Sequence, residues 1–427
     1  MTDYVEKIAE KLNAGTPVFL YTLGGDTLSV IKELDFRFGL KASGVCDGDD
    51  KKQGKTYRGL NGLVVTPFDE ALAKYPRSEF FITSMDYRFQ IMGQLLENGK
   101  IPPERIINYE PVEKRRTCSC LEKFIDYDED GKLLCCWTPQ SPAAERNNFK
   151  KFYDMRKNVI DLLINNAETP EFYKSYPACN GCAYIKTEYY PVARKSWWLN
   201  YFGFNPCNYK CSYCNVKHIP VDKSEVLDMD ACLRALKDNE MLSEWYGIVY
   251  STAGEPTLHP ARKKLYDAFD GFAFIVNTNG SILDYDLFDL MNREKVKLVI
   301  SVDAGTRETY QKIKSVDTFD KVRKNLIKYS EAKIGITALK YVFIPGINDN
   351  DEDVNGFINL CLETNCGYVI ISYAYGYEEK MTEKTYGIMK KLSDKLKELD
   401  FFVTPYTQFE TPEYAAKIRG ILDGGEL

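Results

Sequence analysis

Three cysteines lie close enough in the chain to act together on one metal centre. Cys207, Cys211 and Cys214 have the spacing C-x3-C-x2-C within the segment NPCNYKCSYC. Thiolates at such a spacing can bind a soft-metal centre, for example an iron–sulfur cluster. A four-iron cluster needs four ligands, so this segment would leave one iron open to a group that is not protein. The alternatives are free or disulfide-bonded cysteines, or three of the four ligands of a zinc site.

A second group of cysteines precedes the first, between residues 111 and 190. Residues 124–134 predict a β-hairpin with an Asp-Gly turn, and a hairpin brings together its two ends, which both carry cysteine here. Further along, Cys179 and Cys182 form a C-x2-C turn that suits metal binding. A four-cysteine zinc site is the alternative to an iron–sulfur cluster. The whole group consists of Cys118, Cys120, Cys135, Cys136, Cys179 and Cys182.

Composition supports a metal rather than disulfides. The 427-residue chain has thirteen cysteines but only two histidines, which leaves little room for His-rich zinc sites or histidine acid–base chemistry. The net formal charge is −6, and no Lys/Arg-rich block suggests nucleic-acid binding. We find neither a signal-peptide layout nor an apolar run of membrane-spanning length, and we expect a cytoplasmic protein without a membrane partner. In a reducing compartment, clustered cysteines indicate metal.

The elements that must position these residues alternate regularly over 191–380. Six apolar strand patterns are separated by helical patterns such as 229–242 and 306–315. This order predicts a parallel, partly closed barrel of six βα units, with functional residues at the C-terminal strand ends. The predicted strands are 197–202, 247–251, 272–280, 296–303, 334–343 and 368–373.

Polar residues follow three of these strands at the ends where a barrel has its active site. An Ala-Gly-Glu-Pro-Thr segment, 253–257, follows the second strand. Each of these residues alone fits an ordinary turn or core position, but their order along the chain indicates one site. The candidates are Gly254, Glu255, Asn277, Asn279, Ser301 and Asp303.

The cysteine spacing and the Gly-Glu-Pro segment together resemble the radical S-adenosylmethionine (SAM) enzymes, over roughly residues 195–375. The resemblance implies a [4Fe-4S] cluster on the first three cysteines, with SAM bound to the open iron. It also implies that an electron breaks a carbon–sulfur bond of SAM, and that the resulting 5′-deoxyadenosyl radical takes hydrogen from a substrate carbon. A reducing protein such as flavodoxin or ferredoxin would supply the electron.

The same resemblance gives roles to the strand-end residues. Gly254 and Glu255 would hold the SAM amino group, although Ala253 replaces the first glycine of the family's G-G-E-P element. Ser301 and Asp303 would bind the ribose hydroxyls. Tyr213 would pack against the adenine, and Asn277 and Asn279 would contact SAM or the substrate.

The second cysteine group resembles the auxiliary modules called SPASM and twitch, which bind extra [4Fe-4S] clusters. In most family members such a module follows the barrel, whereas here it precedes it. The resemblance implies one auxiliary [4Fe-4S] cluster. Whether Cys118 or Cys120, and Cys135 or Cys136, bind iron stays open. The candidate ligands are Cys118, Cys120, Cys136, Cys179 and Cys182.

Residues 1–110 show a βαβ rhythm with strands predicted at 17–21, 41–47 and 79–83. A Gly24-Gly25 turn and the segment 52–55 (KQGK) resemble the Rossmann-type domain that precedes nucleotide-sugar acetyltransferases. The glycines fall short of the full dinucleotide-binding pattern, so a docking domain is the alternative.

We therefore predict an α/β protein: a Rossmann-like parallel domain (1–110), an auxiliary iron–sulfur module (111–190), a partial (β/α)6 TIM barrel (191–380) and C-terminal capping elements (381–427). The favoured function is radical oxidation or epimerisation of a sugar, nucleotide sugar or similar polar small molecule. Radical modification of a peptide is the alternative. A hypothesis of another class is a non-catalytic iron–sulfur or zinc protein for electron relay or binding.

Overall fold

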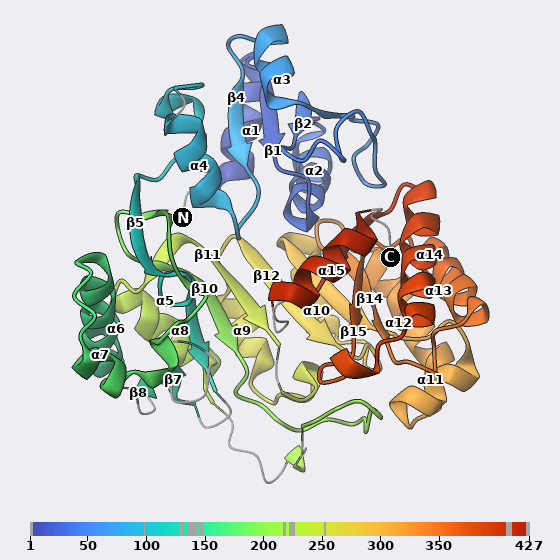
Figure 1. Cartoon of the computed structure of the whole chain (residues 1–427). Helices are drawn as coiled ribbons and strands as arrows, with labels where there is room; N and C mark the ends of the chain where they lie inside the picture. The colour runs from blue at the N-terminus through green and yellow to red at the C-terminus, as the bar shows by residue number, and fades with distance from the viewer. Residues whose placement is uncertain are drawn as a thin grey trace. The chain divides into compact units, whose positions relative to one another are not determined.

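The computed structural model shows a mixed α/β protein (Figure 1). Its chain divides into two compact units. The first unit contains residues 1–21, 77–206 and 218–275, and the second contains 22–76, 207–217 and 276–427. The structure describes residues 3–97, 99–128, 131–134, 136, 143–144, 148–216, 219–221, 227–251, 253–406 and 412–423.

The predicted alternation of parallel strands and helices along the barrel segment is confirmed. The strands are β10 (Ser196–Tyr201), β11 (Leu242–Tyr250), β12 (Ala273–Thr278), β13 (Val296–Ser301), β14 (Ile336–Phe343) and β15 (Tyr368–Tyr373). The helices between them are α8 (Met229–Asp238), α9 (Arg262–Ala268), α10 (Tyr285–Arg293), α11 (Arg307–Lys314), α12 (Phe319–Ser330) and α13 (Asp351–Glu363).

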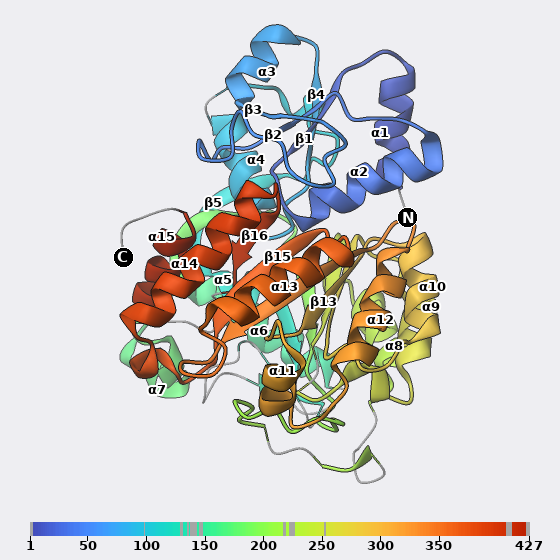
Figure 2. The ribbon, with the colours of Figure 1, turned by 90° about the vertical axis from the view of Figure 1, so that its right-hand side faces the viewer.

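In the second unit, β13, β14 and β15 pair in parallel, and β16 (Phe402–Pro405) adds a further parallel strand beside β15. One face of these strands is covered by α12 and α13, as Figure 2 shows. On that face the ring of Tyr341 lies 4.8 Å from the ring of Phe357 in α13. Side chains alternate along a strand, so Ser301 and its register partner Lys340 lie on the opposite face. The C-terminal helices are α14 (Glu383–Glu398) and α15 (Pro412–Leu422).

The first unit contains the hairpin that was predicted between the cysteines. Strand β6 (Phe124–Tyr127) pairs antiparallel with β7 (Leu133–Leu134), and a short β8 (Ala143–Ala144) follows. The sequence did not predict that β6 also pairs in parallel with β10. An antiparallel ribbon of β5 (Val112–Cys118) and β9 (Ile185–Pro191) was missed as well. Helices α5 (Ser119–Lys123), α6 (Phe149–Ile164) and α7 (Pro170–Ser175) complete this region.

The N-terminal residues form short parallel strand pairs, as the βαβ rhythm predicted. In the first unit β1 (Val18–Tyr21) pairs with β4 (Glu79–Ile82), and in the second β2 (Gly44–Cys46) pairs with β3 (Val65–Thr66). The helices of this region are α1 (Tyr4–Asn13), α2 (Gly25–Phe38), α3 (Phe68–Lys74) and α4 (Arg88–Glu97). Among the helices in the described ranges, none has the length and apolar character that a membrane span requires.

The glycine turn at the start of α2 packs against the barrel strands of its own unit. A Cβ added to Gly25 would lie 3.1 Å from side-chain carbons of both Lys297 and Tyr368. Asp26 forms an ion pair of 2.8 Å with Lys297, whose side chain is only 8 % exposed. The helix N-terminus, where a phosphate would bind, thus already faces protein. These contacts favour the docking role of this turn over phosphate binding.

Candidate functional site

The three cysteines lie on one irregular loop in the second unit. Cys207 and Cys211 are half-buried, whereas Cys214 is exposed. The backbone N–H of Tyr209 donates to the Sγ of Cys207 at 3.4 Å, and the N–H of Cys214 donates to the carbonyl of Cys211 at 3.0 Å. Among the described residues, no three His, Cys, Asp or Glu side chains are already grouped as ligands of a metal ion. The backbone of the loop is therefore folded, but its three sulfur atoms do not yet converge.

The loop is hydrogen-bonded to α11 and to the turn that follows this helix. The hydroxyl of Tyr209 lies 3.1 Å from the hydroxyl of Tyr310 and also shares a hydrogen bond with Thr318. Both tyrosines are buried. Because these bonds join side chains that are far apart in the chain, they restrict the loop that carries the cysteines without using any of its thiols.

Asp303 lies at the centre of a buried polar group directly beyond β13. Its Oδ1 accepts the N–H of Val342 at 2.9 Å, and its Oδ2 accepts the hydroxyl of Tyr213 at 2.7 Å. The ammonium of Lys314 forms an ion pair with the same Oδ2. The side chains of Asp303 and Lys314 are 0 % and 1 % exposed. Contact between Asp303 and a ribose, as predicted from the sequence, would require some of these bonds to be exchanged.

Electrostatics keep this group charged in spite of its burial. Burial alone lowers the pKa of Lys314, but the carboxylate of Asp303, together with Tyr213 and Cys211, outweighs it and holds this pKa well above its usual value. Burial also raises the pKa values of the Tyr213 phenol and the Cys211 thiol. Lys314 opposes the rise at Cys211. The structure thus contains a permanent buried ion pair beside one cysteine of the loop.

Gly254 and Glu255 pack closely against the residues that precede the cysteine loop. The N–H of Gly254 donates to the carbonyl of Phe204 at 3.0 Å, and the N–H of Glu255 donates to that of Pro206 at 2.8 Å. A Cβ added to Gly254 would lie only 2.0 Å from the oxygen of Pro206. The carboxylate of Glu255 is buried and accepts from both the N–H and the hydroxyl of Thr257. Glycine is therefore needed here for close backbone approach.

The two asparagines after the third barrel strand differ in their contacts. Asn279 donates from Nδ2 to the side chain of Asn208 at 2.9 Å, and Asn208 directly follows the first cysteine of the loop. Asn277 is half-buried at the end of β12, as is Ser301 at the end of β13. The structure thus places Asn279 as a support of the loop. A contact of Asn277 or Ser301 with a cofactor or substrate stays a prediction.

His259 is a buried residue of this region that the sequence did not single out. The N–H of Ala261 donates to its Nδ1 at 3.1 Å, so Nδ1 acts as an acceptor and we assign the ring proton to Nε2. Nε2 lies 3.2 Å from the hydroxyl of Tyr201, which donates to the carbonyl of Gly203. The only signal in the sequence is its position four residues after Glu255.

Burial makes His259 a pH-sensitive element of stability. It lowers the pKa of the imidazole from 6.5 to about 4. The unfolded chain binds this proton first, so the stability contributed by neutral His259 is complete above about pH 6.5 and is lost as the pH falls toward 4. The expected loss at pH 5 is about 2 kcal/mol. Urea unfolding of cluster-free protein at about pH 7.5 and pH 5 checks this. Between these two pH values, His259→Gln should lose less stability than the wild type, because it lacks the imidazole.

The auxiliary cysteines come together in the first unit through the ribbon of β5 and β9. Cys118 is the register partner of Ile185, and the N–H of Ser119 donates to the carbonyl of Tyr184 at 2.8 Å. These contacts bring the end of β5 beside the segment that follows Cys182. Gly181, between the two cysteines of the C-x2-C turn, has a φ of 68°, which favours glycine. The ribbon, rather than the hairpin alone, joins the two ends of the group.

The thiols of this group interact with one another. Cys118 and Cys120 share a hydrogen bond, which lowers the pKa of Cys118 and raises that of Cys120. Cys179 interacts electrostatically with Cys118, Cys136 and Cys182, and burial raises its pKa to about 12. Cys135 lies outside the described residues. The five described cysteines are thus neighbours, while their role as ligands stays a prediction.

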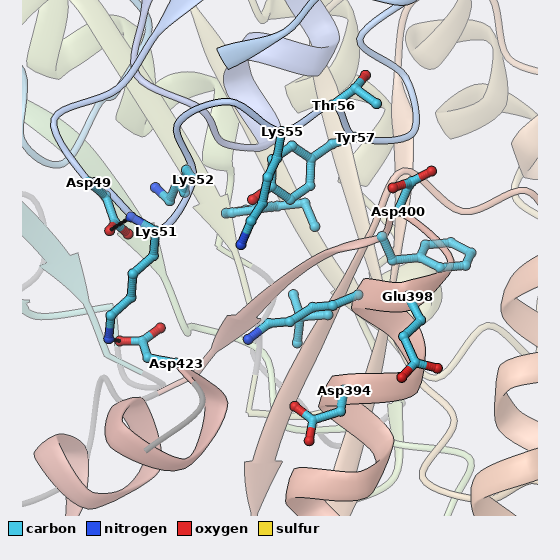
Figure 3. A pocket seen from close by; sticks show the side chains of 14 residues that line it. Asp49, Lys51, Lys52, Lys55, Thr56, Tyr57, Asp394, Glu398, Asp400 and Asp423 are labelled. Carbon is cyan, nitrogen blue, oxygen red and sulfur yellow. Dashed lines mark hydrogen bonds and ion pairs between the residues drawn. The ribbon is translucent and has the colours of Figure 1, made fainter. Parts of the chain in front are cut away.

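A cavity of about 590 Å³ lies apart from these residues, in the second unit between residues 49–57 and the C-terminal elements (Figure 3). Several of its lysines have polar partners nearby. Lys51 lies 3.8 Å from Asp423, and Lys52 lies 3.0 Å from Asp47. Lys397 donates to the carbonyl of Leu422. With five acidic and four basic side chains, the lining shows no marked surplus of one charge, and it contains no residue predicted to bind a cofactor.

Comparisons with known proteins agree with the site described here. Residues 202–359 match the profile of the radical SAM superfamily. Over 203 residues the chain is 28 % identical to the molybdenum cofactor biosynthesis protein moc-5 of Caenorhabditis elegans, covering 44 % of this chain and 32 % of that protein. A probable GTP 3′,8-cyclase of Saccharolobus islandicus is 29 % identical over 162 residues, which are 36 % of this chain and 49 % of the relative. The chain thus spans a third to a half of the length of these relatives.

A solved structure of similar fold is that of SuiB from Streptococcus suis bound to its precursor peptide SuiA, with 14 % identity and a TM-score of 0.40. The match covers 68 % of this chain and 72 % of SuiB. The matched profile includes both the cysteine loop and the Gly-Glu-Pro segment. Residues 202–359 of this chain are thus similar to the radical SAM superfamily, and the cofactors that this family implies are a [4Fe-4S] cluster and SAM.

Proposed function

We propose that this protein is an enzyme that cleaves SAM reductively and uses the product radical to remove hydrogen from a substrate carbon. The proposal is carried by one observation, the close packing of Gly254 and Glu255 against Asn205 and Pro206 directly before the first cysteine. The segment that the sequence linked to the SAM amino group therefore packs against the residues that directly precede the first cysteine in the chain. The comparisons support the superfamily, and the activity of the whole protein is our proposal.

The residues present fit the cluster by the chemistry of the donor set. Cys207, Cys211 and Cys214 are thiols on one loop, and no histidine or carboxylate of the described chain joins them in a metal-binding group. Thiolates are the ligands that iron–sulfur clusters take. Cys211 and Cys214 already interact electrostatically.

The bound cluster and SAM would supply the electron transfer and the carbon radical, so the protein has to hold and shield them. The buried tyrosines 209 and 310 fix the loop, and Asp303 fixes Tyr213 beside it. The buried carboxylate of Glu255 holds the turn after β11 through Thr257. These contacts keep the cofactor-binding segments in place and exclude water from their supports.

Anaerobic incubation of reconstituted protein with SAM and dithionite tests the proposal. We expect 5′-deoxyadenosine to form, and to form faster when the substrate is present. The variant with Cys207, Cys211 and Cys214 all replaced by alanine should form none. Replacement of the buried Cys232, which belongs to α8, is the matched control and should retain activity. Equal product from the triple variant would show that SAM cleavage does not depend on this loop.

We further propose that the second cysteine group binds one auxiliary [4Fe-4S] cluster. The neighbouring positions of Cys118, Cys120, Cys136, Cys179 and Cys182 support it. Cys179→Ala is expected to lower the iron of reconstituted protein from the content of two clusters to that of one. Cys46→Ala, which removes a buried thiol in β2, should leave iron unchanged. Zinc in place of iron would instead support a zinc site.

For the substrate we propose a nucleotide or nucleotide sugar, with a sugar carbon as the site of hydrogen removal. The names of the relatives, a GTP cyclase and a protein of molybdenum cofactor biosynthesis, favour a polar nucleotide-like molecule over a free sugar. Oxidation or epimerisation is the proposed outcome, and peptide modification is the runner-up. Stimulation of 5′-deoxyadenosine formation by GTP or by nucleotide sugars, compared with unrelated peptides, distinguishes the two.

A further inference from the structure

Cys211 and Lys314 are held side by side by hydrogen bonds between their chain neighbours. The N–H of Ser212 donates to the carbonyl of Ile313 at 2.8 Å. On the other side, the hydroxyl of Ser315 donates to the carbonyl of Lys210, also at 2.8 Å. The residues that flank the cysteine are thus bonded to the residues that flank the lysine. This arrangement places the middle cysteine of the loop next to the end of α11.

The ammonium of Lys314 is enclosed in this position. Its side chain is 1 % exposed, it pairs with Asp303, and it donates to the hydroxyl of Tyr213 at 3.3 Å. It also lies 5.4 Å from the centre of the Tyr213 ring. Tyr213 itself stands between the second and third cysteines of the loop. The cation is thus fixed by three contacts with residues of the site and cannot reach solvent.

The charges near the loop do not act on it equally. Asp303 carries the countercharge of Lys314, so the pair as a whole is neutral. The nearby Tyr310 is a buried phenol. Lys314 is the member whose chain neighbours are hydrogen-bonded to those of Cys211, whereas Oδ1 of Asp303 accepts the N–H of Val342 in β14. The loop therefore lies beside the positive end of this pair.

We propose that Lys314 is a positioning residue that sets the reduction potential of the cluster bound by Cys207, Cys211 and Cys214. The proposal rests on the proposed function, because it assumes that a cluster occupies this loop. A fixed cation in a region of low dielectric favours the reduced, more negative form of a neighbouring redox centre. Reduction of the cluster is the step at which SAM cleavage begins, so Lys314 would make that step easier.

A redox titration with detection of the reduced cluster by EPR tests the inference on the full-length reconstituted protein, without any substrate. At the potential where half of the wild-type clusters are reduced, we expect the ratio of reduced to oxidised cluster in Lys314→Met to be about tenfold lower. For one electron this equals a shift of about 59 mV to lower potential. Lys314→Arg keeps the charge and should stay near wild type.

Asp303→Asn is expected to shift the reduction potential in the opposite direction. It removes the anion, while the thiolates of the bound cluster, Cys211 among them, still favour the protonated lysine, and it should raise the ratio of reduced to oxidised cluster. Asparagine suits the site because residue 303 has a φ of 64°, which Asn and Asp tolerate better than other non-glycine residues. The matched control is Arg307→Met, at the exposed start of the same helix, which should leave the potential unchanged.

The outcomes separate the inference from the proposed function. Absence of an EPR-active cluster at this loop in wild-type protein would overturn the proposed function, and the inference with it. A cluster that forms in all variants at one common potential would overturn the inference alone, since a purely structural lysine lowers cluster content without moving the potential. If Lys314→Met assembles no cluster, the upward shift in Asp303→Asn decides the question.

Discussion

Replacement of Gly254 by alanine is expected to abolish SAM cleavage. The added methyl group would lie 2.0 Å from the oxygen of Pro206 and 2.3 Å from that of Asn205. Both are backbone atoms and cannot swing aside, so the two segments must move apart and break the bonds that join them. Cys207 follows directly and would move with Pro206. A misplacement of about 1 Å at a reactive centre can lower a rate about 100-fold, and we expect at least this loss of 5′-deoxyadenosine formation.

The same substitution should lower the stability of the cluster-free protein, at the upper end of the range of about 1–3 kcal/mol for overpacking. Urea unfolding measures the loss of stability, and equilibrium dialysis measures any loss of SAM binding. The matched control is Gly420→Ala in α15, because a Cβ at Gly420 would meet nothing within 4 Å. Normal SAM cleavage by the Gly254 variant would show that the close approach has no part in the reaction.

The strands and helices followed from local patterns where those patterns had clear ends. The predicted bounds 368–373 are those of β15. The helix predicted over 229–242 runs too far, because α8 ends at Asp238 and Leu242 already begins β11. Glu240 adopts a φ of 54°, which ends the helix, while the buried Met241 and Leu242 prolong the apolar pattern. The parallel pairing of β6 with β10 joins residues far apart in the chain, and no local pattern contains that information.

The parts of the candidate site that could be predicted are those whose residue patterns are rare in protein sequences. Clustered cysteines and a Gly-Glu-Pro segment stand out, but Lys312 and Lys314 look alike as basic residues at the end of a helix. Only the fold shows that Lys312 is exposed while Lys314 is buried against Asp303. For the same reason the sequence assigned Tyr213 and Asp303 to separate parts of SAM, whereas the structure joins them by a hydrogen bond. Burial and partners depend on tertiary packing, which motif spacing does not encode.

Replacement of Lys314 by methionine is expected to destabilise the cluster-free protein by about 3–5 kcal/mol, the cost of leaving one member of a buried ion pair unpaired. Among the described residues, Val342 and Tyr213 would then be the hydrogen-bond donors left to the buried charge of Asp303. Asp303→Asn should destabilise for the converse reason, because the ammonium would lose the carboxylate with which it forms its ion pair. Urea unfolding monitored by circular dichroism gives both values.

The double variant makes this a test of the pair rather than of either residue. If the two charges stabilise each other, Lys314→Met combined with Asp303→Asn costs clearly less than the sum of the single changes. Additive costs would instead show that each side chain acts alone. The exposed pair of Arg307 and Asp317, 2.6 Å apart on and beside the same helix, is the matched control, and Arg307→Met should change stability little because solvent screens exposed charges. Strong coupling of the buried pair, together with a small effect at the exposed pair, would show that burial makes the difference. The Lys314–Asp303 contact would then be a structural support of the cysteine loop.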